Sequence, residues 1–310
     1  MEVIEDIEKI EKPFKDAVVT IGNFDGVHLG HQALFRQVIR QAAQINGTSV
    51  VITFDPHPLR ALGKEGPPLI TRRDQKIELI SDSGVDRIIC IPFTREFAST
   101  EPKDFIYDFL IGKIGMKSII VGQDYSFGKD RKGDINLLRA ESPKGGFSVI
   151  IPDWIHDAGN GNERISSTKV RKLVMEGRVG DAPKYLGRQY QIRGKVVRGR
   201  DRGGRKLGFP TANIKLHDEL CPKFGVYAVT VETSHGNFRG VANIGYSPTF
   251  DDNMFTIEVH IIDDFSHDIY NTRIRVNMAA RLREEKRFSN IEELSGQIKK
   301  DIQKAKEILQ

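Results

Sequence analysis

The stretch that decides the fold of the first half of the chain is Gly22-Asn23-Phe24-Asp25-Gly26-Val27-His28-Leu29-Gly30-His31-Gln32. An apolar run at residues 17–21 leads into it, and apolar residues then recur about one helical turn apart through residues 34–42. This pattern predicts a strand, a tight turn and a helix. Glycines suit the turn because they tolerate positive φ and close backbone approach.

The two histidines of this stretch are three residues apart, so they share one face of the helix if it begins there. A helix N-terminus beside two imidazoles suits a phosphate, because backbone and ring N–H groups converge on it. Two isolated histidines would more commonly be polar surface. Here they bracket a glycine just after a strand and a Gly-x-x-Asp-Gly turn, which favours phosphate binding. Zinc is the weaker alternative, since it needs a third and usually a fourth ligand.

Length and composition are those of an ordinary globular protein. The 310 residues are 39% hydrophobic and 29% charged, and such a chain is long enough for two domains. No apolar run approaches the roughly 20 residues that span a bilayer. Residues 1–15 are acidic and mixed, unlike a signal peptide. Cys90 and Cys221 imply no disulfide framework, so the sequence predicts a cytoplasmic protein.

The charge balance is mildly basic, with 47 Lys and Arg residues, 42 Asp and Glu residues and a net charge of +5. Such a balance is compatible with nucleic-acid binding. However, basic and acidic residues are interspersed, and no Lys/Arg cluster interleaved with aromatic residues stands out. Small phosphorylated ligands explain the excess as well, and we expect neither a nucleic acid nor a membrane as partner.

The rest of the first half alternates strands with helices. Strands are predicted at residues 49–54, 87–92, 118–122 and 147–151, and helices at 73–83 and 102–114. This alternation predicts a parallel, doubly wound sheet. The loops Asp55-Pro56-His57-Pro58 and Gln123–Gly128 each follow a strand, and such loops line the ligand crevice of α/β sheets. His57 is therefore a candidate ligand contact, with an ordinary surface position as the alternative.

A second distinctive stretch is Ile165-Ser166-Ser167-Thr168-Lys169-Val170-Arg171, followed by a helical pattern that ends at Gly177. Hydroxyl residues at such a place are commonly N-caps. A cap explains one of the three hydroxyls, whereas three of them beside Lys169 and Arg171 also form an anion site. Neither a Gly-x-Gly-x-x-Gly fingerprint nor a Walker-type loop is present, which disfavours a Rossmann dinucleotide domain and a Walker-type ATPase.

After residue 186 the pattern changes to six short strand-like runs, which predict a closed antiparallel barrel. Five of them lie at residues 191–197, 225–232, 238–244, 256–262 and 272–278. A final helix carries an apolar stripe over residues 291–308. We expect it to dock on the barrel after a capping box of Ser289 and Glu292.

The loop at residues 199–213 is rich in glycine and basic residues and could wrap phosphates through its backbone N–H groups. A long surface connection or a nucleic-acid tail is the alternative. Thr211 and Asn213 at its end point to the same side of an extended chain. Their oxygens suit a Mg²⁺ ion whose other ligands are water and phosphate oxygens.

The first half resembles the nucleotidyltransferase superfamily. His28-Leu29-Gly30-His31 is similar to its His-x-Gly-His signature, and residues 165–171 are similar to its Ile-Ser-Ser-Thr signature. The Asp-Pro-His-Pro loop and the Gly-x-Asp-x-x-Phe-Gly loop resemble one branch, the FMN adenylyltransferase module of prokaryotic FAD synthetases. This resemblance implies catalytic roles for His28 and His31 and FMN contacts from His57 and Asp124. It implies ATP contacts from Gly22, Asn23, Phe24, Asp25, His28, Gly30, His31, Ser167, Thr168 and Arg171.

The second half resembles riboflavin kinase over its whole length. The motifs that carry this resemblance are Gly-Phe-Pro-Thr-Ala-Asn (208–213), Gly-Val-Tyr-Ala (225–228), Asn-Ile-Gly-x-x-Pro-Thr-Phe (243–250), Glu-Val-His (258–260) and Arg-x-Glu-x-Lys-Phe (283–288). The resemblance implies that Glu258 is the general base and that Thr211 and Asn213 bind the metal of Mg-ATP. It also implies ATP contacts from Gly203, Lys206, Gly208, Thr211 and Asn213. Asn271 stands where the family usually has glycine, which puts the adjacent turn and flavin affinity in question.

The combined prediction is a bifunctional enzyme with an adenylyltransferase domain at 1–186 and a riboflavin kinase domain at 187–310. It would use ATP and Mg²⁺ to convert riboflavin to FMN and FMN to FAD. We expect small-molecule partners, with flavoprotein apo-clients possible, and a monomer or weak oligomer. Alternatives are a monofunctional kinase with a degenerate first domain, a cytidylyltransferase or pantetheine-type adenylyltransferase, and a nucleic-acid-binding regulatory protein.

Overall fold

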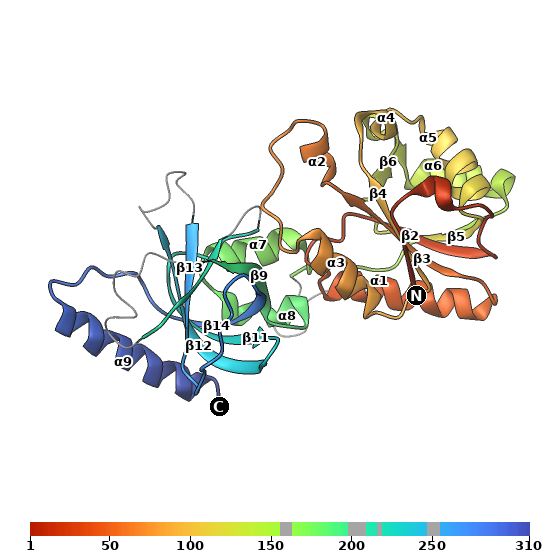
Figure 1. Cartoon of the computed structure of the whole chain (residues 1–310). Helices are drawn as coiled ribbons and strands as arrows, with labels where there is room; N and C mark the ends of the chain where they lie inside the picture. The colour runs from red at the N-terminus through yellow and green to blue at the C-terminus, as the bar shows by residue number, and fades with distance from the viewer. Residues whose placement is uncertain (156–162, 198–208, 216–218, 247–254) are drawn as a thin grey trace. The chain divides into compact units, whose positions relative to one another are not determined.

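The computed structural model describes residues 1–155, 163–197, 209–215, 219–246 and 255–310. Its contacts divide the chain into two compact units (Figure 1). The first unit comprises Met1–Pro67 and Thr71–Ser166, and the second comprises Pro68–Ile70 and Ser167–Gln310. The predicted domain boundary at residue 186 stays a prediction.

The first unit is built on a six-stranded sheet with the order β1-β4-β3-β2-β5-β8, in which every neighbouring pair is parallel. Its strands are β1 (Glu2–Ile4), β2 (Ala17–Ile21), β3 (Ser49–Asp55), β4 (Arg87–Pro92), β5 (Met116–Ile120) and β8 (Ser148–Ile150). Five of these strands were predicted to within about two residues, a difference normal at element ends. The strand predicted at 147–151 is β8, which confirms the parallel sheet.

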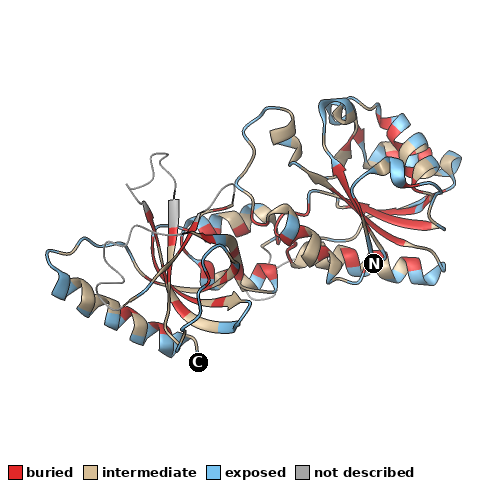
Figure 2. Cartoon of the chain, in the orientation of Figure 1, coloured by how far each residue is buried: buried red, intermediate tan, exposed pale blue. Residues whose placement is uncertain are grey.

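Helices cover both faces of this sheet. The helices of this unit are α1 (Leu29–Gln44), α2 (Pro58–Ala61), α3 (Arg73–Ser81), α4 (Arg95–Ala98), α5 (Pro102–Asp104), the π-helix η2 (Phe105–Lys113) and α6 (Ile135–Gly145), with short 3₁₀ helices η1 (Ile7–Lys9) and η3 (Lys129–Arg131). Alternate residues of one strand face opposite sides: Ile52 packs with the aromatic and aliphatic residues of η2, whereas Val51 packs with Phe35 of α1. Buried residues run along the strands in Figure 2, which confirms the doubly wound arrangement.

Several features of the first unit were not predicted. Strand β1 consists of three residues, too few for a periodic pattern, and exists through its parallel pairing with β4. The β6 (Ser126–Phe127) and β7 (Gly133–Asp134) hairpin and helix α6 lie in a segment where no pattern was recognised. The helix predicted at 102–114 is present, but Phe105–Lys113 is wound as a π-helix, with Ile114 N–H donating to Phe109 O, five residues back.

The second unit is a closed antiparallel barrel with the order β10-β13-β12-β11-β14-β9, as predicted. Its strands are β9 (Tyr190–Val197), β10 (Ala212–Lys215), β11 (Gly225–Thr233), β12 (Gly236–Tyr246), β13 (Phe255–Ile261) and β14 (Arg273–Arg283). Helices α7 (Ser167–Met175) and α8 (Pro183–Leu186), with the 3₁₀ helix η4 (Val179–Asp181), belong to this unit. Ile257, Val259 and Ala242 are almost fully buried and alternate with the more polar residues of β13 and β12.

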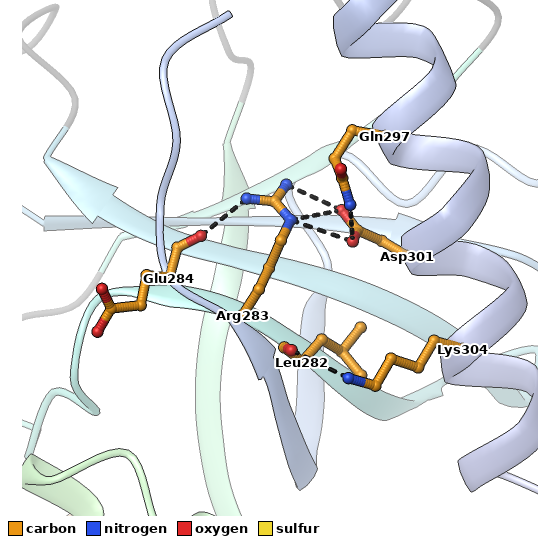
Figure 3. A network of polar contacts seen from close by, with 6 residues as sticks. All are labelled: Leu282, Arg283, Glu284, Gln297, Asp301 and Lys304. Carbon is orange, nitrogen blue, oxygen red and sulfur yellow. Dashed lines mark hydrogen bonds and ion pairs between the residues drawn. The ribbon is translucent and has the colours of Figure 1, made fainter.

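The final helix, α9 (Ile291–Ile308), packs on β11, β12 and β14. Arg283 at the end of β14 donates to both carboxylate oxygens of Asp301, and Lys304 donates to Leu282 O (Figure 3). Docking on the barrel is confirmed, although Ile291 and Ile308 of the predicted stripe are exposed.

The predicted capping box was wrong by one residue. Asn290 is the N-cap, because its side chain accepts the N–H of Glu293 at 2.8 Å, while the Glu293 carboxylate accepts the N–H of Ser289. Asn and Ser are both strong N-caps, so the sequence alone did not discriminate between these neighbours.

Candidate active sites

The turn between β2 and α1 has an unusual backbone. Phe24, Gly26 and Val27 all have positive φ, at 48°, 86° and 40°. The Phe24 ring is buried against Phe35 and His31, and a Cβ on Gly22 would lie 2.9 Å from that ring. Two non-glycine residues in this region cost free energy, and such strain persists where surrounding contacts overdetermine the conformation, often at functional sites. Because the Phe24 ring is buried, any contact that Phe24 makes with ATP would come from its backbone.

The two histidines of this turn are brought together at the start of α1. His28 is the N-cap, and its Nδ1 accepts the N–H of His31 at 3.3 Å. The rings stack with centroids 3.5 Å apart and planes at 19°. Because Nδ1 is an acceptor, neutral His28 carries its proton on Nε2, where it can donate to a ligand. Gly30 permits this arrangement, since a Cβ there would lie 3.2 Å from the His28 ring.

The His31 ring is held neutral by its surroundings. Burial, the neighbouring His28 and the positive charges of Lys76 and Arg164 all lower the pKa of His31 well below its ordinary value. Its Nδ1 is buried, and among the described residues it has no hydrogen-bond partner. A neutral His31 ring beside His28 at a helix N-terminus can donate a hydrogen bond to a phosphate without repulsion from a second positive charge.

Side-chain contacts tie the turn to neighbouring segments. The buried carboxylate of Asp25 accepts both the N–H and the hydroxyl of Thr71, at 3.0 and 3.1 Å. The Asn23 amide lies 3.4 Å from Nε2 of His57, which caps α2 in the loop after β3. The structure thus brings together the predicted site residues Asn23, His28, His31 and His57 at the carboxyl ends of β2 and β3.

Asp124 lies in a separate polar cluster of the same unit. Its exposed carboxylate accepts a hydrogen bond from Arg164 at 2.9 Å, and the Arg164 guanidinium lies 3.2 Å from the centroid of the Trp154 ring. The charge of Arg164 also acts on His31. Arg164 and Trp154 were not predicted as site residues; the one signal for them in the sequence is that Trp154 is the single tryptophan of the chain.

The hydroxyl-rich stretch opens helix α7, in the second unit. Ser167 and Thr168 are its first two residues, and Nε of Arg171 donates to Pro68 O at 3.0 Å. These predicted ATP contacts stay predictions.

In the barrel, strand register aligns the candidate kinase residues. Glu258 of β13 is directly opposite Asn213 of β10 and Asn243 of β12. Residues directly opposite each other in antiparallel strands share a face of the sheet. Asn213 is almost fully buried, and the imidazole Nδ1 of His260, two residues beyond Glu258, lies 2.9 Å from Pro210 O. Gly203, Lys206 and Gly208 lie outside the described residues.

The environment of Glu258 suits a base. Burial, together with the negative charge of Glu285, raises the pKa of Glu258. The Glu285 side chain lies over the backbone of Gly245, where a Cβ would overlap its carboxylate. Carboxylate, amide and hydroxyl oxygens are the donors that Mg²⁺ prefers, so Thr211 and Asn213 fit such an ion. Among the residues that the structure describes, no cluster of three or more His, Cys, Asp or Glu side chains could hold a metal.

A parallel sheet with a histidine pair at a helix N-terminus, joined to a barrel with a half-buried glutamate, defines a two-domain phosphate-transferring enzyme. A family model for FAD synthetase matches residues 10–169, and one for riboflavin kinase matches residues 186–309. The chain belongs to the family of bifunctional riboflavin kinase/FMN adenylyltransferases.

Curated relatives support this assignment. A bifunctional riboflavin kinase/FMN adenylyltransferase of Buchnera aphidicola is 37% identical over 97% of this chain and 96% of the relative. That of Escherichia coli K12 is 36% identical over 99% of this chain and 97% of its own. A solved structure described as a macrolide-efflux protein from Streptococcus pneumoniae has a TM-score of 0.84 at 34% identity and covers 98% of each chain. In the described part of this chain, no helix has the length and apolarity needed to cross a membrane.

These findings confirm the predicted family, fold and class of bifunctional enzyme. They support the main prediction over the alternative of a monofunctional kinase, because both catalytic domains have their own family match. The assignment of individual site residues stays a prediction.

Proposed function

We propose that the first unit transfers the adenylyl group of ATP to FMN, and that the second unit transfers the γ-phosphoryl group of ATP to riboflavin. The observation that carries the first half is the stacked His28–His31 pair at the N-terminus of α1. The row of Asn213, Glu258 and Asn243 across three barrel strands supports the second half.

In adenylyl transfer, a phosphate oxygen of FMN attacks the α-phosphorus of ATP in line. A new P–O bond forms, the bond between the α-phosphorus and the bridging oxygen breaks, and pyrophosphate leaves. Nε2 of His28, the His31 ring and N–H groups in the first turn of α1 would donate to the triphosphate and stabilise its developing charge. Removing one such preorganised donor typically lowers the rate by about 100-fold or more.

The acceptor flavin would be held at the carboxyl ends of the neighbouring strands. His57, whose position is tied to Asn23, and Asp124 are the proposed FMN contacts. Gly22 and Gly30 serve by their lack of a side chain, because a Cβ at either would press on Phe24 or His28. Asp25 holds the turn through Thr71.

In the kinase unit, Glu258 would accept the proton of the riboflavin 5′-hydroxyl while that oxygen attacks the γ-phosphorus of ATP and ADP leaves. A raised pKa brings a carboxylate closer to the operating pH, where a general base is most effective. Thr211 and Asn213 would hold Mg²⁺, which when bound neutralises charge on the phosphates. We expect a cytoplasmic enzyme, monomeric or weakly oligomeric, with small-molecule partners.

The test uses the purified full-length chain with riboflavin, ATP and Mg²⁺, followed by chromatography of the flavins. FMN and then FAD should accumulate. His31→Ala should stop at FMN, whereas Glu258→Ala should leave riboflavin unchanged and still convert supplied FMN to FAD. His235→Ala, at the exposed β11–β12 turn, is the matched control and should keep both activities. Unchanged riboflavin with wild-type protein, or loss of both activities in both folded variants, would refute the proposal.

A further inference from the structure

Lys76 is a buried lysine that the proposed chemistry does not use. It lies on α3, and only 7% of its surface is exposed. Its ammonium donates to the backbone oxygen of Phe54 at 2.8 Å and to that of Asn23 at 3.3 Å. Phe54 lies near the end of β3 and Asn23 just past the end of β2. One cation therefore joins the ends of two neighbouring parallel strands.

The contact is part of a larger connection between the two loops. The hydroxyl of Thr53 also donates to the Asn23 oxygen, at 3.2 Å, so this carbonyl has two donors. Beyond the carbonyl, the Asn23 amide reaches His57. Lys76 thus acts on the backbone of both the turn that carries His28 and the loop that carries His57.

Stability alone does not explain a lysine at this position. Burying an ammonium is unfavourable unless charges and hydrogen bonds compensate. Asp25, Asp55 and the Cys90 thiol favour the charge of Lys76 and Arg73 opposes it, yet none of the ion pairs found in the described part of the chain includes Lys76. Burial lowers the pKa of its ammonium. A methionine of similar length would fill the same space without that cost.

The charge of Lys76 also reaches the histidine pair. The groups that act on the titration of His31 are His28, Lys76 and Arg164, and the two cations both disfavour a positively charged ring. A change at Lys76 is therefore expected to alter the electrostatics of the site as well as its geometry.

We propose that Lys76 is a positioning residue for adenylyl transfer, holding the turn at residues 22–28 and the loop at residues 55–58 at a fixed separation through the carbonyls of Asn23 and Phe54. This rests on the proposed function of the first unit. With both loops fixed, the triphosphate donors and the flavin-contacting loop keep their alignment for in-line attack. A misplacement of about 1 Å can lower a rate by about 100-fold.

The test compares full-length Lys76→Met and Lys76→Arg with the exposed control Lys117→Met. Lys76→Met should lower kcat for FAD synthesis by about 100-fold, with KM for ATP and FMN changing less than about threefold. Riboflavin phosphorylation by the same polypeptide should be unchanged. Lys76→Arg, which keeps the charge and the donors, should recover at least about tenfold of the loss. Lys117→Met should match wild type.

A purely structural role would not move the pH dependence of the remaining activity. Removing the Lys76 charge raises the pKa of His31, so the acid limb of kcat/KM for FAD synthesis should move to higher pH in Lys76→Met and stay in place in Lys76→Arg. Near-wild-type FAD synthesis by Lys76→Met overturns the inference. So does a Lys76→Arg protein that keeps kinase activity but gains nothing over Lys76→Met. If wild-type protein makes no FAD, the proposed function fails first.

Discussion

Thr71 and Asp25, 46 residues apart in the chain, form a two-point contact: the N–H and the hydroxyl of Thr71 both donate to the same carboxylate oxygen. The Thr71 hydroxyl also accepts the N–H of Gly26 at 2.9 Å. Thr71, which lies far from this segment in the sequence, therefore holds the positive-φ turn before the histidine pair in place.

Thr71→Val should loosen this turn, because it removes one donor to Asp25 and the acceptor for Gly26 while keeping the shape of the side chain. Leaving buried groups without these partners should lower the free energy of unfolding of the first unit by about 2–3 kcal/mol. FAD synthesis should fall by at least about tenfold as the histidines lose their fixed geometry.

Denaturant unfolding followed by fluorescence measures this effect, since the single tryptophan, Trp154, lies in the first unit. Thr71→Ser keeps the hydroxyl and should stay close to wild type in both stability and activity. Equal behaviour of the Val and Ser variants would show that the hydroxyl does not hold the turn.

The stack of Arg164 on Trp154 should orient the guanidinium more than its ion pair with Asp124 does. Both charged side chains are exposed, and exposed pairs contribute little, whereas a cation over an indole contributes about 0.5–2 kcal/mol. Trp154→Ala should therefore lower kcat/KM for FAD synthesis by about tenfold, and Trp154→Phe by less, because phenylalanine retains a weaker ring face. Kinase activity is the internal control. An unaffected Trp154→Ala protein would rule out this role.

Riboflavin phosphorylation should lose activity at low pH as Glu258 becomes protonated. Burial and then Glu285 raise the pKa of Glu258, so the acid limb lies above the ordinary range of a glutamate. Glu285→Gln removes the like charge, lowers the pKa of Glu258 and should shift the acid limb of kcat/KM to lower pH. The control Glu284→Gln, at an exposed neighbour, should leave the limb in place. A limb that stays in place in Glu285→Gln would contradict the coupling.

The attachment of α9 should depend on Asp301. This carboxylate is buried and accepts hydrogen bonds from Arg283 and from Gln297 (Figure 3). Asp301→Ala leaves Arg283 with its charge uncompensated, so the barrel unit should be destabilised by about 3 kcal/mol, the lower end for a buried pair because Arg283 is partly exposed.

Far-UV circular dichroism during denaturant unfolding reports this loss, while Trp154 fluorescence should show an unchanged first unit. Gln303→Ala removes a side-chain contact with Glu307 on the exposed face of the same helix and should have little effect. A similar shift in both variants would argue against a specific role for the Arg283–Asp301 pair.

Much of the architecture follows from local patterns in the sequence. Strand β2, the glycine turn and helix α1 follow from an apolar run, two glycines and a helical period within about thirty residues. The alternating strands of the barrel likewise encode which side chains face inward, because period-2 alternation is a property of each strand alone. The motifs on these elements were sufficient to predict the family.

Other features depend on contacts that no sequence window contains. Three residues become strand β1 because β4 offers an edge with which to pair. Asn213 and Glu258 become neighbours through strand register across 45 residues, and Lys76 meets Asn23 and Phe54 through the packing of α3.

The sequence by itself determined the order of most long elements, the two kinds of sheet and the residue types that suit phosphate chemistry, because each follows from local periodicity and composition. Only the tertiary structure decided which nitrogen of His28 accepts the N–H of His31, why the pKa of His31 falls and which cation connects two loops. Those properties arise from burial and from groups brought close by folding, and neither can be read from the order of the residues alone.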